Sequence, residues 1–489
     1  MPSLKELLKH TNSPNEKDIE LITRAYEYAE KAHLPQKRAS GEPYFNHVYS
    51  TAITLADLGM SSTVIASGLL HDTVEDTEVT EEDLEKFFGK EIQFLVHGIT
   101  KLGKLKYRGV ERNVENMRKF FVSMAEDLRV IVIKLADRLH NIQTLSHLRP
   151  DKQKRIALET LEIYAPLANR LGMGKLKGEL EDAAFPYAYP KEHALVVELL
   201  KEKKEVNAKY LTEVERALKK NFKMQGLNYV SVDQRVKHLY SLYKKMQKYE
   251  MDIDKVYDII AVRVIVENIE QCYQVLGIIH GLWKPLPGRI KDYVATPKPN
   301  GYKSIHTTIF TGTGGVVEIQ IRTKDMHEQA EYGIAAHFAY KENLNKTKKN
   351  KIALQYPWVE ELRNAEMNIN GSENFLESLK SDFFKDRVFV FTPKGDIIDL
   401  PEESCAVDFA YAIHSDIGDH IAGAKVNNKF VSISTKLKSG DIVEVTTKKD
   451  VNPSSKWLDY AKTTLARHRI QKYLRENSLL SKFLSFGGK

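Results

Sequence analysis

The sequence contains few cysteines and no long apolar run, and each absence excludes a class of protein. Only two cysteines, Cys272 and Cys405, occur in 489 residues. This excludes a disulfide scaffold and a cysteine-ligated zinc site, so any metal must be held by histidines and carboxylates. No apolar run reaches the ~20 residues of a membrane helix, and the charged N-terminus lacks a signal-peptide core. We therefore expect a soluble, cytoplasmic protein with no membrane partner.

Length and charge allow several domains and an anionic ligand. A chain of 489 residues is too long for one hydrophobic core, which predicts roughly three domains. A hydrophobic content of 42% is sufficient for packed cores. The net charge of +7 is compatible with nucleotides or RNA as ligands. Nothing in these totals predicts the oligomeric state.

The first part of the chain is helical and the second mixes helices with strands. In residues 1–190, apolar positions recur at spacings of three and four, which predicts an all-α domain with linking helices. Residues 191–340 begin with a long amphipathic helix, predicted over 191–222. The β-branched runs 256–266, 304–310 and 316–322 follow, which predicts an α/β domain.

The remaining part of the chain is smaller and more basic. Residues 341–385 are rich in lysine, with a signal of order only at 358–362, and are predicted to be a linker. Short strands around a helix at 406–414 predict a β-grasp-like module over 386–448. A basic amphipathic helix, predicted over 457–474, occupies the tail at 449–489.

The first candidate site is an acidic segment that follows an apolar helical run. His71, Asp72, Glu75 and Asp76 stand at i, i+1, i+4 and i+5, which is one side of a predicted helix. Adjacent carboxylates repel one another unless a cation lies among them, so the segment predicts a metal site.

Two further segments carry polar residues that suit such a site. Asp137, Asn141 and Thr144 form a polar stripe on an otherwise apolar helix, and His47 is a further ligand candidate. Any one of these residues, taken alone, is more often a helix cap, an ion pair or a surface residue.

The second candidate site centres on the loop 288–306. Pro297, Pro299 and Gly301 exclude a helix there. Cations and one aromatic side chain suit phosphates and a base: Arg289, Lys291, Lys298, Lys303 and Tyr302. Taken alone, such a loop is more often a solvated, lysine-rich surface segment than a binding site.

Three predicted strands add polar faces to this loop. Glu318, Gln320 and Arg322 alternate with apolar residues, and His306 and Thr308 do the same. Asp258 and Glu318 on neighbouring strands would hold magnesium. Alternation places Asp258 and Arg263 on opposite faces, so both serve one site only if Asp258 precedes the strand or a bulge intervenes. An ordinary half-solvated sheet is the alternative.

A cluster of cations precedes these strands. Lys237, Ser241 and Lys245 are spaced by four on a helix predicted to begin near Gln234, and that face suits a polyphosphate. A basic, solvated helix face is the alternative.

Together these motifs resemble the long RelA/SpoT homologue family, which makes and degrades the alarmone (p)ppGpp. The resemblance covers nearly the whole chain: a hydrolase of the HD phosphohydrolase superfamily, the link 165–173, a nucleotidyltransferase-like synthetase and a TGS-like module at about 387–448. In the hydrolase it implies that manganese is bound by His47, His71, Asp72 and Asp137. Glu75 and Asp76 would orient or deprotonate the attacking water, and Arg38, Asn141 and Thr144 would contact the alarmone.

For the synthetase, the resemblance implies transfer of pyrophosphate from ATP to the 3′-hydroxyl of GDP or GTP, with release of AMP. Arg235 and Arg263 would flank adenine, and Lys237, Ser241 and Lys245 would hold the ATP phosphates. Asp258 and Glu318 would bind magnesium, with Glu318 also acting as the base. The acceptor nucleotide would be bound by Lys291, Lys298, Asn300, Tyr302, His306 and Gln320.

The resemblance also predicts that both activities are present. His71-Asp72 is intact, and 289–292 is the basic form seen in bifunctional members. The TGS-like module implies contact with a ribosome and an uncharged tRNA, through His414. From the comparison with longer members, we expect this sequence to lack their zinc-finger-like and ACT modules.

Two alternatives stay open: a predominant hydrolase whose synthetase domain senses nucleotides, and a ribosome- or tRNA-binding module with vestigial catalysis. The chain also departs from the usual family residues at four positions, Ala39, Val48, Gly178 and Val236.

Overall fold

The structure of the protein, a computed structural model, describes residues 2–103, 127–298, 300–312, 314–341 and 387–486. These residues form two compact units, one ending with α17 (Ile334–Lys341) and the other beginning with β6 (Arg387–Phe391). Except for Lys341, the predicted linker at 341–385, with its segment 358–362, lies outside the described residues. None of the described helices has the length and apolar character needed to span a bilayer.

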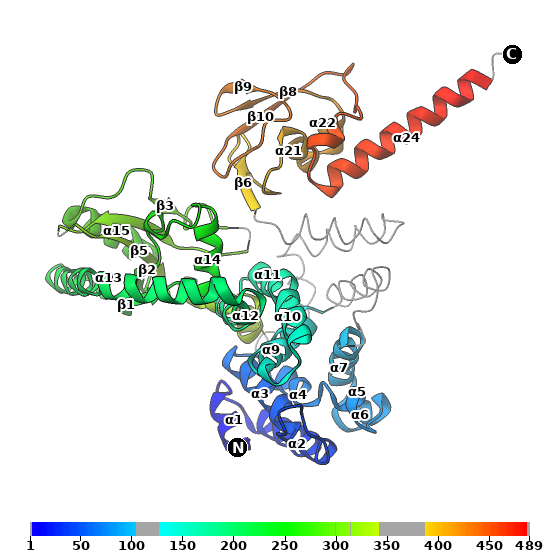
Figure 1. The fold of residues 1–489 in the computed structure, drawn as a ribbon, viewed down its shortest axis with the longest axis vertical. Helices are drawn as coiled ribbons and strands as arrows, with labels where there is room; N and C mark the ends of the chain where they lie inside the picture. The colour runs from blue at the N-terminus through cyan, green and yellow to red at the C-terminus, as the bar shows by residue number, and fades with distance from the viewer. Residues whose placement is uncertain (1, 104–126, 299, 313, 342–386, 487–489) are drawn as a thin grey trace. The chain divides into compact units, whose positions relative to one another are not determined.

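The first unit begins with a helical bundle, as predicted (Figure 1). Its central helix, α4 (Ser62–Leu70), is buried on nearly all sides because most of its side chains are apolar or small. It packs against α2 (Glu16–Ala32), α3 (Phe45–Asp57) and α7 (Lys90–Gly103), and α3 also packs against α9 (Leu128–Gln143). The other helices among the described residues of this part are α1 (Leu4–His10), α5 (Thr73–Asp76), α6 (Glu81–Phe88), the 3₁₀-helix η1 (Leu145–His147), α10 (Pro150–Glu159), the π-helix η2 (Thr160–Tyr164) and α11 (Ala165–Arg170).

The acidic segment after α4 is not one continuous helix, which corrects the sequence prediction. α4 ends at Leu70, and the short helix α5 starts only at Thr73. The Thr73 hydroxyl donates to the Leu70 carbonyl (2.7 Å), and His71 Nδ1 lies 2.8 Å from the Gly68 carbonyl. Side chains that bond to carbonyls of the last helical turn compete with continuation of the helix. His71 and Asp72 therefore lie at a break between two helices.

Two long helices connect the bundle to an α/β part. α12 (Gly174–Ala188) contacts both α9 in the bundle and α14 (Leu239–Gln247) beyond it. α13 (Pro190–Met224) runs along the α/β part, with bounds close to the predicted helix (Figure 1). Gly178 of α12, a departure from the family pattern, has His238 against it, and a Cβ there would lie 2.2 Å from His238 Nε2. His238 Nδ1 also lies 2.8 Å from Asp182 Oδ2, so His238 fills this contact between the two parts.

The α/β part contains a mixed sheet of five strands in the order β1-β2-β5-β4-β3. β2 and β5 are parallel and the other neighbours are antiparallel. Val262, Val264, Ile319 and Ile321 on the central strands are buried in the core with α13, α14 and α15 (Ile269–Leu282). The strands are β1 (Ser231–Val236), β2 (Ile260–Val266), β3 (Lys291–Asp292), β4 (Ile305–Phe310) and β5 (Val316–Thr323).

The register places polar residues in rows across one face of this sheet. Arg263 of β2 pairs with Asp233 on one side and Gln320 on the other, and Gln320 pairs with His306. Asp258 lies before β2, so the alternation within the strand does not place it on the face opposite Arg263. Both residues can therefore serve one site without a bulge.

The second unit is a small module of antiparallel sheets around a helix. β6 pairs with β7 (Ile397–Pro401), and β8 (Ile421–Val426) pairs with β9 (Lys429–Val431) and β10 (Val443–Thr447). The helix α21 (Ala406–Ile413) agrees with the prediction, and a short helix, α22 (Ser415–Asp419), follows it.

The predicted single tail helix is wrong, because the chain breaks between α23 (Trp457–Tyr460) and α24 (Thr464–Phe486). The buried Asp408 carboxylate accepts the backbone N–H groups of Lys462 (2.9 Å) and Thr463 (2.7 Å). These bonds use two donors that a continuous helix would have paired internally.

Candidate active sites

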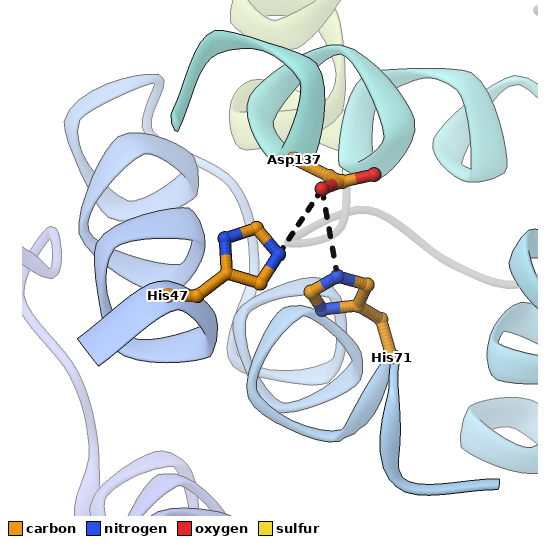
Figure 2. A group of neighbouring side chains, drawn as sticks. All are labelled: His47, His71 and Asp137. Atoms are coloured by element: carbon orange, nitrogen blue, oxygen red, sulfur yellow. Dashed lines mark ion pairs between the residues drawn. The ribbon is translucent and has the colours of Figure 1, made fainter. Parts of the chain in front are cut away.

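Three helices bring the predicted metal ligands together in the bundle. His47 lies on α3, His71 directly follows α4, and Asp137 lies on α9. One ligand atom from each lies within 4.8 Å of the others, and Figure 2 shows the three side chains pointing toward one another. Asp72 joins them, with Oδ2 3.1 Å from His71 Nε2 and 3.4 Å from His47 Nε2. The four predicted ligands therefore converge.

The electrostatics of this cluster suit a divalent cation. Although burial opposes it, the carboxylates of Asp72 and Asp137 raise the pKa of His71 to about 10. The pKa values of both carboxyl groups lie well below their usual range, against the effect of burial, because Asp72 faces His71 and Asp137 faces Lys134. The buried His71 Nε2 faces Asp72 Oδ2 (3.1 Å) and Asp137 Oδ1 (3.8 Å) as an ion pair. Two imidazoles and two carboxylates that converge in this way fit a first-row divalent metal.

The predicted alarmone contacts lie beside the cluster and bond to one another. Arg38 donates to Thr144 Oγ1 (3.2 Å) and to Asn141 Oδ1, and Asn141 donates to Asp137 Oδ1. Arg38, Asn141 and Thr144 also line a cavity of about 300 Å³, together with Lys134 and Arg138. This cavity places cations next to the predicted metal ligands, an arrangement that suits phosphate groups.

The two predicted acids after His71-Asp72 differ in placement. The Tyr44 hydroxyl lies 2.8 Å from Asp72 Oδ2 and 2.7 Å from Asp76 Oδ2, so Asp76 is connected to the cluster. Burial, followed by the charge of Asp72, raises the pKa of Tyr44 far above its ordinary value, so this hydroxyl is a donor. Both acids are exposed on α5. The contact with Tyr44 is thus the feature that connects Asp76 with the cluster.

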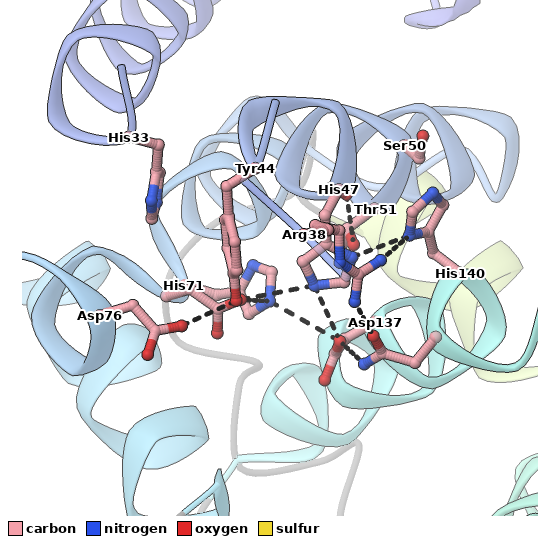
Figure 3. Close-up of polar contacts among 12 residues, drawn as sticks. His33, Arg38, Tyr44, His47, Ser50, Thr51, His71, Asp76, Asp137 and His140 are labelled. Atoms are coloured by element: carbon pink, nitrogen blue, oxygen red, sulfur yellow. Dashed lines mark hydrogen bonds and ion pairs between the residues drawn. The ribbon is translucent and has the colours of Figure 1, made fainter. Parts of the chain in front are cut away.

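Sequence reasoning missed Tyr44 and His140 in this site. His140 Nδ1 lies 2.9 Å from His47 Nδ1 and 3.0 Å from Arg38 Nη1 (Figure 3). Burial and the charges of His47 and Arg38 lower the pKa of His140 to about 3, so it is neutral. The sequence feature that could have identified His140 is its position three residues after Asp137, which places the two side chains one helical turn apart on α9.

The second site is a cavity of about 570 Å³ over the polar face of the mixed sheet. All predicted synthetase residues line it: Arg235, Lys237, Ser241, Lys245, Asp258, Arg263, Lys291, Lys298, Asn300, Tyr302, His306, Glu318 and Gln320. The basic loop, the strands and the cation cluster thus contribute to one cavity.

The predicted helix for the cation cluster begins too early. Arg235 lies on β1, and α14 starts at Leu239, so Lys237 precedes the helix. β1 forms because its residues pair with β2, and the Lys237 N–H continues that pairing by donating to the Ile259 carbonyl (2.9 Å). Lys237 and Lys245 nevertheless meet, because both contact the same carboxylate of Asp258.

Both predicted magnesium ligands are paired with side chains of the cavity. Lys237 Nζ lies 2.7 Å from Asp258 Oδ2 and Lys245 Nζ 2.7 Å from Oδ1. Against the effect of burial, these lysines hold the pKa of Asp258 well below its usual range. Glu318 Oε1 lies 3.3 Å from His306 Nδ1, and this contact lowers the pKa of Glu318, again against burial. Both carboxyl groups are therefore ionised.

The predicted acceptor side combines aromatic rings and cations. Lys298 Nζ lies 5.1 Å from the centre of the Tyr302 ring and 4.7 Å from that of Tyr293. The Tyr302 hydroxyl lies 2.8 Å from His306 Nε2. Burial, with the charges of Lys291 and Lys237, lowers the pKa of Lys298 to about 8. Lys298 is thus a cation held in an unfavourable environment, which a phosphate would relieve.

The cavity also contains residues that sequence reasoning did not assign to it. Lys177, from α12, contacts Ser241 Oγ (3.0 Å) and Glu181 Oε2 (2.9 Å). Arg322 is 1% exposed and donates to Gln320 Oε1 (3.0 Å) and the Tyr302 hydroxyl (3.2 Å). Strand alternation already placed Arg322 beside Gln320, whereas nothing in the sequence connects Lys177 with a site more than 60 residues away.

In the second unit, His414 is largely exposed. It is the N-cap of α22, where its Nδ1 accepts the N–H of Asp416 (3.2 Å). Asp408, from the same predicted segment, is fully buried and bonds to the chain before α24.

Comparison with known protein families assigns three regions of the chain. Residues 25–174 match the HD domain, residues 234–345 match the region found in RelA / SpoT proteins, and residues 388–447 match the TGS domain. These regions contain the helical bundle with its cluster, the mixed sheet with its cavity, and the small β module.

Curated relatives resemble nearly the whole chain. It is 45% identical over 486 residues to the guanosine-3′,5′-bis(diphosphate) 3′-pyrophosphohydrolase of Aquifex aeolicus, covering 99% of this chain and 69% of that protein. It is 47% identical to a GTP pyrophosphokinase of Myxococcus xanthus, covering 94% of this chain and 61% of that protein. It is 44% identical to the bifunctional (p)ppGpp synthase/hydrolase SpoT of Escherichia coli, covering 94% of this chain and 65% of that protein. The chain thus spans about two thirds of the length of these relatives.

Proposed function

Because the chain belongs to the RelA/SpoT family, we propose that it is a bifunctional alarmone enzyme with two separate active sites. One site would transfer pyrophosphate from ATP to the 3′-hydroxyl of GDP or GTP, giving (p)ppGpp and AMP. The other would hydrolyse (p)ppGpp to GDP or GTP and pyrophosphate. The observation that carries this proposal is the presence, in one chain, of a buried His/Asp cluster and a separate cationic cavity with two ionised carboxylates.

In the hydrolase, His47, His71, Asp72 and Asp137 would hold the divalent ion, which we propose to be Mn²⁺. When bound, such an ion makes water more acidic and polarises a phosphoryl oxygen. Arg38, Asn141 and Thr144 would hold the alarmone beside it, in the cavity that they line. Asp76, through its contact with Tyr44, would orient the attacking water or accept its proton, and Glu75 would assist from the surface.

In the synthetase, Arg235 and Arg263 would flank adenine, while Lys237, Ser241 and Lys245 would bind the ATP phosphates. Asp258 and Glu318 would hold Mg²⁺, which neutralises charge on a transferring phosphoryl group. Asp258 and Glu318 would supply two carboxylates, and substrate phosphates would complete the magnesium shell, as is usual for this ion. Glu318 would also accept the proton of the 3′-hydroxyl.

The acceptor nucleotide would occupy the other end of the same cavity. Tyr302 would stack on guanine, and Lys291, Lys298, Asn300, His306 and Gln320 would bind its polar groups and phosphates. The small β module would contact a ribosome and an uncharged tRNA through His414, whose exposure supports this role. A cytoplasmic location stays a prediction from the sequence.

Two incubations test the proposal. The chain with ATP, GDP and Mg²⁺ should release AMP, and the chain with purified ppGpp and Mn²⁺ should release GDP and pyrophosphate, as separated by nucleotide chromatography. Hydrolysis without AMP release would instead favour a hydrolase whose second domain senses nucleotides. Neither product, with or without ribosomes, would favour a binding module with vestigial catalysis.

A further inference from the structure

His140 contacts a proposed metal ligand from the side opposite the metal position. His47 has Nε2 directed at the cluster, 3.2 Å from Asp137 Oδ1, and Nδ1 directed at His140 Nδ1, 2.9 Å away. The two rings lie 5.0 Å apart between centroids. In Figure 3, dashed lines connect one ring nitrogen of His140 with both His47 and Arg38. His140 is thus an outer neighbour of the cluster and not a member of it.

The direction of these hydrogen bonds follows from Arg38. A guanidinium group has only donors, so the 3.0 Å contact from Arg38 Nη1 requires His140 Nδ1 to be an acceptor without a proton. The contact between the two histidines then needs its proton on His47 Nδ1. Whenever His47 is neutral, its lone pair is therefore on Nε2, the atom that faces Asp137 and Asp72.

We propose that His140 is a positioning residue for the metal centre, which holds His47 in the tautomer and orientation that a divalent cation requires. The inference rests on the proposed hydrolase function. Outer partners that fix the tautomer of a ligating histidine are a general feature of metal sites, usually as carboxylates or carbonyls. Here a second neutral imidazole fills that place.

The same bonds connect the metal ligands to the proposed substrate contact. Arg38 donates to His140 and, through its other terminal nitrogen, to Asn141, which in turn donates to Asp137. One guanidinium therefore reaches two proposed ligands, His47 and Asp137, each through one intermediate residue of α9. His140 provides the branch that ends on His47.

The test is the affinity of the full chain for Mn²⁺, measured by the EPR signal of free Mn²⁺ during titration. All variants carry Glu318→Gln, which removes a proposed ligand of the other site. His140→Ala should weaken Mn²⁺ binding by about 10- to 100-fold. His140→Gln should restore most of the affinity, because its amide oxygen can accept from His47 Nδ1. His97→Ala is the matched control: His97 contacts Glu81, away from this network, so its loss should leave the affinity unchanged.

The outcomes separate this inference from the proposed function. Folded His140→Ala protein that binds Mn²⁺ within twofold of the parent would overturn the inference alone. If His140→Ala does not fold, His140→Leu replaces it, and equal affinities of the leucine and glutamine variants would overturn the inference. A parent that binds no Mn²⁺, or binds it equally well after His71→Ala, would overturn the proposed hydrolase and this inference with it.

Discussion

In the helical bundle, carboxylates surround two imidazoles, whereas on the mixed sheet lysines and arginines surround two carboxylates. The pKa shifts reflect this difference. Carboxylates raise the pKa of His71 to about 10 in the first centre, and neighbouring cations help to lower the pKa of Lys298 to about 8 in the second. The first centre is stabilised by an added cation, and the second by an added polyanion.

The difference also suggests an order of binding. The proposed metal ligands of the bundle converge without substrate, so we expect Mn²⁺ to bind to the free protein. In the sheet cavity, Lys237 and Lys245 occupy both oxygens of Asp258. We therefore expect Mg²⁺ to bind there together with ATP, whose phosphates give the two lysines new partners.

The largest expected effect comes from removing one imidazole of the first centre. His71→Ala deletes a buried proposed ligand, so Mn²⁺-dependent hydrolysis of ppGpp should fall below detection. AMP formation from ATP and GDP should stay within about twofold of the parent, because the second site has its own ligands. Chromatography of both reactions measures this, with thermal unfolding as the control for folding. Equal loss of both activities would show that the two centres are not separable.

The corresponding change in the second centre is Glu318→Gln, which keeps the size of the side chain and removes its charge. AMP release should fall by about 10²- to 10⁴-fold if Glu318 is the base, with hydrolysis unchanged. Glu331→Gln is a matched control, since Glu331 lines the same cavity but faces Arg263 (3.6 Å). If both variants lost the same activity, the role assigned to Glu318 would be wrong.

The lowered pKa of Lys298 predicts that GDP binding in the cationic cavity depends on pH. Lys298 is protonated below its pKa of about 8 and loses its charge above it. Because GDP phosphates favour the charged form, the KM for GDP should rise as pH increases above 8, approaching tenfold per pH unit. Lys298→Arg, which stays protonated, should flatten the profile. A parent KM that is constant between pH 7 and 9 would contradict this assignment.

Many residues of the two centres could be predicted from the sequence, because their side chains lie in short segments with regular spacing. The alternation of Glu318, Gln320 and Arg322 and the stripe of Asp137 and Asn141 each describe one face of one element. The fold class is predicted in the same way, from the change between helical and strand periodicity.

What could not be predicted depends on contacts between distant segments. The sequence predicts a helix from Gln234, at the end of β1, because the partner that makes this segment a strand, β2, lies further along the chain. The helix break at His71 and the break before α24 both follow from hydrogen bonds between side chains and the backbone: Thr73 donates to the Leu70 carbonyl, and Asp408 accepts the Lys462 N–H. Lys177 enters the cavity over the mixed sheet because α12 packs on α14. Periodicity carries no information on such contacts.

Lys177 provides the smallest effect and the most direct test of whether the cavity belongs to the α/β part alone. Its ammonium group contacts Ser241 but is already paired with Glu181, and its side chain is 25% exposed. Lys177→Met should therefore raise the KM for ATP only about threefold, as expected for a partly screened charge. Lys175→Met is the matched control, because Lys175 lies on the same helix over the Tyr332 ring and outside the cavity. An equal KM for both variants would mean that α12 supports the cavity without contacting ATP, whereas a selective increase would make the linking helix part of the ATP site.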